Sequence, residues 1–337
     1  MTNQKQFDVI VSASIAFDHV MAFGGSFKDH MIADKMDVLS VSFLVDSLKQ
    51  QRGGVGGNMA YSLALLGAKT ALVGAVGRDF DPYGAVLDEL GVDLSHIVQI
   101  PDDFTSNAYM NADRQGNQIV AFYPGAGSHS VEIDVRDIAS KAAYGIISAA
   151  GPDAMMEHAR QFIAAGTRLV FDPAQQIVIL DGNQLVEGIN GAEIVIGNEY
   201  EFGMIENKTG MTFEDVARKV PVAIRTLAER GSEIHAGGDH VLIPPAVPSP
   251  FVDPTGGGDA WRSGFLKGLL IGADLPVAGR MGSLAATYAI EFHGTQEHDF
   301  SAAEFVQRFD QAFPDFAGQV PVELLARNPA THPATRT

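Results

Sequence analysis

Residues Asp253–Ile271, DPTGGGDAWRSGFLKGLLI, contain the most informative pattern of this sequence. Three consecutive glycines precede a stretch whose apolar residues recur at helical spacing, namely Trp261, Phe265, Leu266 and Leu269. Free N–H groups and the positive dipole end of a helix start form an anion site, and glycines let a ligand approach the backbone. Asp259 would point a carboxylate at that anion, and the dipole predicts a low pKa for it. A flexible turn followed by an N-capping aspartate would have the same sequence, so composition alone leaves both interpretations open.

Upstream of this segment, short apolar runs rich in Val and Ile alternate with helical stretches. The runs predict strands buried on both faces, and they are Phe7–Ala13, Thr70–Val76, Tyr144–Ala149, Arg168–Asp172, Glu193–Gly197 and Val222–Thr226. The helical stretches between them include Asn58–Leu66, Tyr83–Leu90, Asp153–Ala164 and Phe213–Lys219. The last third of the chain is predicted to be mainly helical, over Asp259–Ile271, Leu275–Phe292 and Ala302–Phe313. This alternation predicts an α/β fold with a central, mostly parallel sheet and helices on both faces.

Two segments interrupt the alternation. Thr105–Asp113 and Asn117–Tyr123 flank a glycine-containing turn and predict a β-hairpin. Phe17–Val45 is rich in Met and Phe but has no clear period. We interpret both segments as a small β-rich lid formed by about residues 16–50 and 104–125, within a single domain that spans residues 1–325. Alternatively, both segments are ordinary surface loops that do not cover a ligand site. Residues 326–337 are rich in Pro and Thr and predict a frayed tail.

Composition narrows the classes of partner. The chain has 337 residues, with 41 Asp and Glu against 23 Lys and Arg, and its net charge of −18 disfavours nucleic acid and anionic membranes. The sequence has no cysteine, which excludes disulfides, thiolate metal sites and Cys nucleophiles. The N-terminus has no apolar leader, so we expect a soluble, cytoplasmic protein. For the oligomeric state, the sequence is consistent with both a monomer and a homodimer.

Two further segments carry polar groups at helix starts. Gly53–Asn58, GGVGGN, precedes a predicted helix, where close approach of a small polar ligand and a tight helix entry are both consistent with the glycines. Asn198 and Glu201 follow a predicted strand and share a helix face. Their amide and carboxylate suit Mg²⁺ held through waters, but an Asn N-cap with a Glu reaching back is the favoured interpretation from the residues alone.

The two glycine segments together resemble the ribokinase-like, pfkB-type family of sugar and nucleoside kinases. That family shows a GGxxxN segment and a D-T-T/P-G-A-G-D segment, matched here by Gly53–Asn58 and Asp253–Asp259. Its N-x-x-E magnesium motif matches Asn198–Glu201, and its nucleotide-binding T-L-G-x-x-G segment resembles Thr226–Gly231. Gly257 departs from the usual Ala and Ala228 from the usual Gly. The resemblance covers about residues 7–315 and implies a ribokinase-like fold.

The resemblance also implies roles for individual residues. Asp259 would be the general base, and the amides of Gly256, Gly257 and Gly258 would form an anion hole for the transferred phosphoryl group of ATP. Mg²⁺ would lie near Asn198 and Glu201, with Thr226 and Gly231 at the nucleotide. A monovalent cation such as K⁺ would bind through groups matching Asp253 and Thr255.

Several segments resemble bacterial adenosine kinases most, including Ser14–Met31, Val41–Leu48, Gly116–Gly127 and Glu291–His298. In that subgroup the acceptor ribose is held by groups matching Asp18, Gly54 and Asn58, and the lid aromatic Phe122 favours a base as ligand. The resemblance therefore implies transfer of the γ-phosphoryl group to the 5′-hydroxyl of adenosine. A broader nucleoside kinase, a ribokinase or other sugar kinase, and a non-catalytic ligand-binding member are the alternatives.

Overall fold

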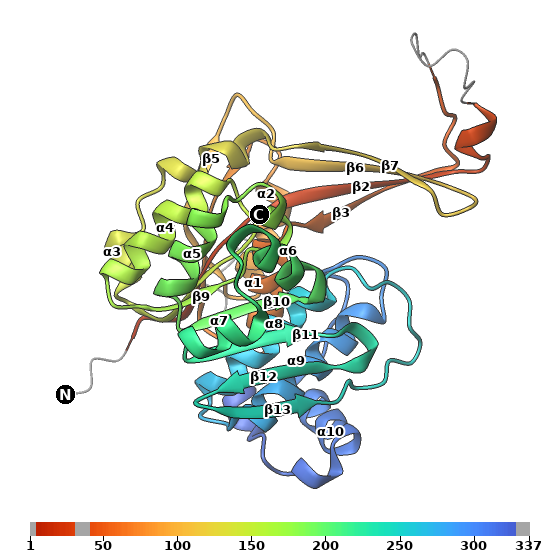
Figure 1. Ribbon diagram of the computed structural model, residues 1–337. Helices are drawn as coiled ribbons and strands as arrows, with labels where there is room; N and C mark the ends of the chain where they lie inside the picture. Colours follow the sequence, from red (N-terminus) through yellow and green to blue (C-terminus); the bar gives the residue numbers. More distant parts are fainter. Residues whose placement is uncertain (1–4, 31–40, 328–337) are drawn as a thin grey trace, which may run out of the picture.

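The main sheet has the parallel architecture that the sequence predicts. The computed structural model describes residues 5–30 and 41–327, and within them a nine-stranded sheet has the order β13-β12-β11-β10-β9-β8-β1-β4-β5 (Figure 1). Its strands are β1 Phe7–Ser12, β4 Thr70–Gly77, β5 Asp93–Ile100, β8 Ala142–Ile147, β9 Arg168–Phe171, β10 Ile194–Asn198, β11 Val222–Thr226, β12 Ser232–Ala236 and β13 Asp239–Ile243. All neighbouring pairs are parallel except β11–β12 and β12–β13, which are antiparallel.

Helices cover both faces of this sheet because its strands are apolar on both sides. Val9 and Val11 of β1 contribute to the core under one layer of helices, whereas Ile10 contributes to the core under the other. The first layer comprises α1 Val55–Leu65, α2 Asp81–Glu89, α8 Gly257–Leu270, α9 Leu275–Ile290 and α10 Ala302–Ala312. The second comprises α3 Arg136–Ala139, α4 Pro152–Ala164, α5 Gly182–Gly191, α6 Glu199–Thr209 and α7 Phe213–Lys219. The predicted fold class is confirmed.

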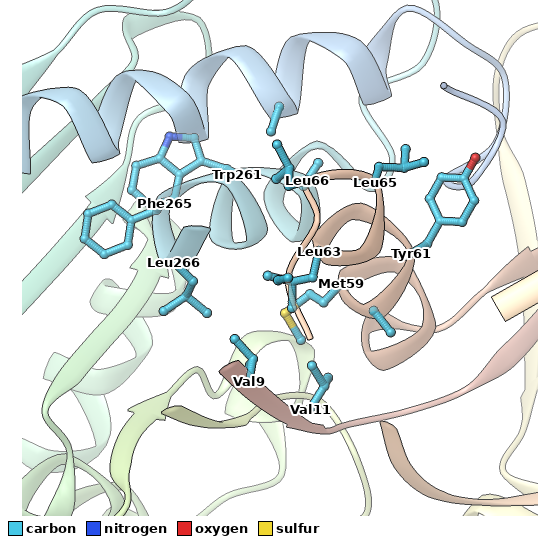
Figure 2. Packing of buried hydrophobic residues seen from close by; sticks show 14 of the residues in the cluster. Val9, Val11, Met59, Tyr61, Leu63, Leu65, Leu66, Trp261, Phe265 and Leu266 are labelled. Carbon is cyan, nitrogen blue, oxygen red and sulfur yellow. The ribbon is translucent and has the colours of Figure 1, made fainter. Parts of the chain in front are cut away.

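Helices α1 and α8 pack directly against each other over β1. Figure 2 shows Met59 and Leu63 of α1 and Leu266 of α8 gathered above Val9 and Val11. Fully burying an aliphatic or aromatic side chain of this size contributes about 1.5–3 kcal/mol to folding. The two glycine-rich segments are the starts of these two helices, so this packing brings Gly54 and Gly256 to one place.

A second sheet of four strands lies beside the main one, in the order β3-β2-β6-β7, among the described residues. It consists of β2 Ala16–Phe23, β3 Ser47–Gly53, β6 Ser106–Asp113 and β7 Gln118–Tyr123, and it projects from the helical body at the upper right of Figure 1. The predicted hairpin is β6–β7. The region without a clear period contains β2 and leads into β3, neither of which was predicted, because most side chains of these two strands are partly or fully exposed and do not alternate.

Some predictions differ from the structure at the periphery. Strands β5, β12 and β13 were not predicted: the edge strands β5 and β13 carry more polar and exposed side chains, and β12 interrupts its apolar run with Ser232, Glu233 and His235. Most of the predicted tail, residues 328–337, lies outside the described residues. Within the described part of the chain, no helix is long and apolar enough to cross a membrane.

Candidate active site

The three consecutive glycines form the turn into α8. Gly256 is the N-cap residue, with a φ of 79° in the left-handed region, and a Cβ there would lie 2.9 Å from the Thr295 side chain. Only glycine meets both conditions without strain. The helix begins at Gly257, so Asp259 is its third residue and not the N-cap. The interpretation of Asp259 as an N-capping aspartate is therefore wrong.

Gly257 departs from the family pattern for a reason that the packing explains. A Cβ at this position would lie 2.8 Å from Cγ2 of Ile290 in α9, closer than side chains approach each other. The Ile290 methyl thus fills the volume that an alanine methyl would occupy. The amide of Gly257 donates a long hydrogen bond of 3.2 Å to the Pro254 carbonyl oxygen. This bond is weak enough to be exchanged for a stronger anionic acceptor.

Asp259 lies at the junction of the two glycine-rich helix starts. The Nδ2 group of Asn58 donates a hydrogen bond of 2.8 Å to Asp259 Oδ2. Burial raises the pKa of Asp259 to about 6, whereas the charge of Arg262 and the Asn58 hydrogen bond oppose this rise. The low pKa expected from the helix dipole is therefore wrong, because desolvation outweighs the dipole at this depth. A carboxylate with a pKa near 6 is a stronger base than an ordinary aspartate and is still largely ionised at neutral pH.

Two residues that sequence reasoning gave no role orient Asn58. Its Oδ1 accepts hydrogen bonds from Thr295 Oγ1 at 2.7 Å and from Gln296 Nε2 at 3.0 Å. With Oδ1 engaged by two donors, the amide has to present Nδ2 to Asp259. Thr295 and Gln296 lie in Glu291–His298, a segment that the sequence analysis singled out only for its resemblance to one subgroup. That resemblance pointed to the segment but gave no role to either residue.

Asp18 of β2 lies against the start of the first glycine segment. A Cβ at Gly53 would lie 2.3 Å from Asp18 Oδ2, so the carboxylate occupies the space that a side chain would need. Burial raises the pKa of Asp18 to about 6. At Gly54, φ is 79° and a Cβ would meet the backbone of Ser14 and Ala16 at 2.6 Å, so this glycine brings α1 close to the chain before β2. The structure thus brings Asp18, Gly54 and Asn58 to one end of α1.

A buried ion pair beneath the site was missed in the sequence. Arg262 of α8 contacts Asp172 through two atom pairs, Nε to Oδ2 at 2.6 Å and Nη2 to Oδ1 at 2.7 Å. Asp172 is fully buried, and Ser148 donates a further hydrogen bond of 2.6 Å to its Oδ2. The signal was present but weak: Asp172 ends a predicted strand, and Arg262 follows Asp259 by one helical turn.

Asn198 and Glu201 form a capping box at the start of α6. Asn198 Oδ1 accepts from the Glu201 amide at 2.9 Å, and Glu201 Oε2 accepts from the Asn198 amide at 2.7 Å. The capping interpretation is therefore correct, and it does not exclude a cation. Burial and the nearby charge of Asp172 raise the pKa of Glu201, and Arg262 Nη2 lies 3.9 Å from Oε2. Such a desolvated carboxylate is stabilised by a cation, so the residues fit water-mediated Mg²⁺.

Thr226 and Gly231 enclose a short turn at the end of β11. Leu227 N–H donates to the Gly231 carbonyl oxygen at 2.8 Å, and a Cβ at Gly231 would lie 2.0 Å from the Ile243 carbonyl oxygen. Ala228, which replaces the usual glycine, has a φ of 52°. The backbone therefore keeps the left-handed conformation that glycine favours, at a cost of roughly 1 kcal/mol.

Asp253 and Thr255 form a local turn just before the glycines. The Thr255 amide donates to Asp253 Oδ1 at 2.9 Å, and Thr255 is exposed. This hydrogen bond accounts for one carboxylate oxygen of Asp253 without a cation.

Phe122 shares a row of the second sheet with Asp18. Asp18 of β2 pairs with Ala108 of β6, and Ala108 pairs with Phe122 of β7, so the three side chains point to the same face. The next row on that face holds Val20, Met110 and Val120. Phe122 and Val120 are 58% and 55% exposed, which leaves an open apolar surface beside the Asp18 carboxylate.

The site lies at the carboxyl ends of the parallel strands, where α/β sheets bind their ligands. Ser148, Asp172, Asn198 and Thr226 all end or directly follow such strands. A sheet of this order with a glycine-rich helix start over that edge defines the class of ribokinase-like small-molecule kinases. The chain belongs to the pfkB family of carbohydrate kinases, whose sequence pattern matches residues 20–302.

Relatives and solved structures agree on this family. A nucleoside kinase of Methanothermobacter thermautotrophicus is 31% identical over 295 residues, which cover 86% of this chain and 95% of the relative. The structure of Burkholderia thailandensis nucleoside kinase in complex with inosine has a TM-score of 0.82 at 33% identity, covering 91% of this chain and 98% of the other. An adenosine kinase structure from Sinorhizobium meliloti shares the fold, with a TM-score of 0.72 at 23% identity and coverage of 86% and 96%. The comparisons support a nucleoside or sugar kinase and not adenosine specificity.

Proposed function

We propose that the protein is an ATP-dependent nucleoside kinase that phosphorylates the 5′-hydroxyl of several nucleosides, adenosine among them. This proposal is broader than the adenosine kinase expected from the sequence. The relative at 31% identity and the solved structure at 33% identity are both described as nucleoside kinases, and the solved structure is a complex with inosine.

One observation carries the choice of a nucleoside over a free sugar. The face of the second sheet that bears Asp18 also bears the exposed apolar side chains of Val120 and Phe122. A ribose hydroxyl pair needs a carboxylate, whereas a planar base is stabilised by an apolar, aromatic surface. Asp18 and Phe122 supply these two surfaces in one row, with only the small side chain of Ala108 between them.

In this proposal the second sheet acts as a lid over the acceptor. Its strand β3 runs directly into the glycines at the start of α1, so movement of the sheet relative to the helices would open and close the acceptor site. Closure would exclude water from the transferring phosphoryl group and favour transfer to the nucleoside over hydrolysis.

The transfer chemistry is assigned to groups at the start of α8. Asp259 would accept the proton of the 5′-hydroxyl as its oxygen bonds to the γ-phosphorus and the bond to the ADP oxygen breaks. The Asn58 hydrogen bond is made to Oδ2 of Asp259, and in the proposal Oδ1 meets the hydroxyl. Amides of Gly256, Gly257 and Gly258 would stabilise charge on the transferred group. Mg²⁺, held near Asn198 and Glu201, would neutralise phosphate charge, as kinases of this family use ATP and Mg²⁺.

A substrate panel tests this proposal. Initial rates of ADP formation are measured with adenosine, inosine, cytidine, ribose and fructose 6-phosphate, each in sodium and in potassium buffers with Mg²⁺. We expect at least two nucleosides to exceed ribose and fructose 6-phosphate in kcat/KM. We also expect potassium to raise the rate if Asp253 and Thr255 hold a monovalent cation.

Other outcomes would assign the protein differently. Turnover of adenosine alone would support the narrower assignment, an adenosine kinase. Preference for ribose or fructose 6-phosphate would identify the protein as a sugar kinase. Saturable nucleoside binding without turnover of any of the five compounds would favour the non-catalytic family member. Equal rates in sodium and potassium would remove the monovalent cation from the proposal.

A further inference from the structure

Three potential metal ligands meet on the hairpin at the far edge of the main sheet. Glu233 and His235 are two residues apart on β12 and therefore share one face of the strand. His240 of β13 is the direct cross-strand partner of His235. The hairpin thus places one carboxylate and two imidazoles on a single patch, by strand pairing alone.

The distances within this cluster match those around a tetrahedral ion. Glu233 Oε2 lies 3.1 Å from His240 Nε2 and 3.6 Å from His235 Nε2, and the three ligand atoms all lie within 4.8 Å of one another. Bonds of about 2.0–2.2 Å in a tetrahedral site separate neighbouring ligand atoms by roughly 3.3–3.6 Å. The two distances to the carboxylate oxygen bracket this range.

Neighbouring groups hold the cluster in place. Arg225 Nε donates a hydrogen bond of 2.5 Å to Oε1 of Glu233, which leaves Oε2 facing the histidines. The His235 ring packs edge-on against Phe213, with ring centroids 4.9 Å apart. The Arg225 guanidinium lies over the Phe213 ring, 4.3 Å from its centroid. Metal-binding carboxylates are commonly oriented by a second hydrogen bond of this kind.

The ligand set and the local charge indicate which ion fits. Arg225 compensates the charge of Glu233, so the cluster offers little net negative charge to a hard ion such as Mg²⁺ or Ca²⁺. Two imidazoles are instead the ligands preferred by Zn²⁺ and its transition-metal neighbours. A surface hollow of about 530 Å³, lined by His235 and by residues of α7 and the hairpin turn, opens His235 to solvent.

We propose that Glu233, His235 and His240 form a binding site for a divalent transition ion of the Zn²⁺ class, with water as a further ligand. The site is separate from the proposed active site. Glu233 and His235 are level with Arg225 and Ala223 of β11 and share their face of the sheet, whereas the neighbouring Thr226 points to the other face. The bound ion fastens β13 to β12 and stabilises the exposed edge of the sheet.

Calorimetric titration of the untagged, full-length, metal-free protein with Zn²⁺ tests the site. The matched control is His129→Ala, because His129 also contacts one carboxylate, Glu132 at 2.9 Å, but belongs to no group of three ligands among the described residues. We expect His235→Ala and His240→Ala to weaken the tightest Zn²⁺ site by at least about 10-fold and His129→Ala to leave it unchanged. Zn²⁺ should raise the melting temperature of the parent protein and of His129→Ala only.

Co²⁺ supplies a second, independent readout. Four-coordinate Co²⁺ in the parent protein should give visible absorption bands that His240→Ala lacks, and kinase activity should be the same with and without the ion. Equal Zn²⁺ affinity in the parent and both histidine variants would overturn the proposal. So would the absence of saturable binding below about 100 µM, which corresponds to only about 5.5 kcal/mol of binding free energy. His240 is half-exposed, so its variant keeps the fold and the comparison stays interpretable.

Discussion

At the scale of single residues, Asp259 is the group on which turnover should depend most. Asn58 fixes its orientation with a hydrogen bond of 2.8 Å, and burial raises its pKa to about 6. We expect Asp259→Asn to lower kcat by about 10²–10⁴-fold, the range for a positioned acid or base, because the amide cannot accept the proton. Nucleoside and ATP affinities should change little.

Steady-state rates and calorimetric binding measure the two effects separately. Asp102→Asn, an exposed aspartate, serves as the control and should keep parental turnover. A folded Asp259→Asn protein that retains more than about a tenth of the parental kcat would contradict the role as general base.

The raised pKa of Asp259 also predicts a pH-dependent difference in stability. Its pKa is 3.8 in the unfolded reference and about 6 in the fold, so the folded state binds the proton more tightly. The parent protein therefore loses stability from this group as pH rises from about 4 to about 6, and Asp259→Asn does not.

Urea unfolding across this pH range gives the measurement. The free energy of unfolding of Asp259→Asn relative to the parent should increase up to about pH 6 and then level off. The gain is limited to about 3 kcal/mol, since each unit of pKa shift corresponds to about 1.4 kcal/mol. A difference that is constant with pH would show that the carboxyl group is not desolvated in the folded protein.

At the scale of elements, the buried pair of Arg262 and Asp172 joins α8 to the end of β9. Asp172 is 0% exposed, so removal of its partner leaves an uncompensated charge in the core. We expect Arg262→Met to lower the free energy of unfolding by about 3–5 kcal/mol. Arg160→Met removes an exposed pair with Glu187 and should cost about 1 kcal/mol or less.

Denaturant unfolding of both variants provides this comparison. In Arg262→Met, the acid limb of the pH–rate profile should also move to higher pH, because the Arg262 charge holds the pKa of Asp259 down. The double variant Arg262→Met with Asp172→Leu should regain stability. If Arg262→Met lowers the free energy of unfolding no more than Arg160→Met does, the buried pair does not stabilise the contact between α8 and the end of β9 more than an exposed pair would.

At the scale of the whole molecule, the second sheet is fastened to the helical body through Arg52 of β3. Its Nη2 lies 3.1 Å from Glu297 Oε1 and donates to the Gln296 carbonyl oxygen at 3.3 Å, and its own carbonyl oxygen accepts from Thr295 at 3.0 Å. We expect Arg52→Met to raise KM for the nucleoside by about 3- to 10-fold, the equivalent of roughly 0.7–1.4 kcal/mol. KM for ATP should change less, because Thr226 and Gly231 lie on the main sheet.

Substrate-dependence curves for both substrates test this joint. Arg136→Met, which removes an exposed pair with Asp134 at the start of α3, should leave both KM values unchanged. An equal rise in both KM values for Arg52→Met would show that the variant loses structure generally. The effect would then not be specific to the nucleoside site beside the second sheet.

Much of the fold follows from the sequence alone because its signals are local. The predicted bounds of Val222–Thr226 and Phe213–Lys219 coincide with β11 and α7, since apolar period and capping act within a few residues. Helices α1 and α8 were also predicted, with starts at Asn58 and Asp259 that lie three and two residues after the observed ones, because glycine runs before a helical period are readable without partners. Strands β2 and β3 escaped prediction, since their side chains are too exposed for the sequence to alternate.

The sequence by itself therefore determined the parallel strands β1, β4, β8, β9, β10 and β11 and their alternation with helices, the family resemblance and the two glycine-rich segments at helix starts. Only the tertiary structure decided which groups meet. Asn58 and Asp259 are 201 residues apart, and Arg262 and Asp172 are 90 residues apart, and no local pattern encodes either contact. The pKa of Asp259 was likewise decided by burial, because desolvation depends on all the chain that surrounds a carboxyl group and not on its neighbours in sequence.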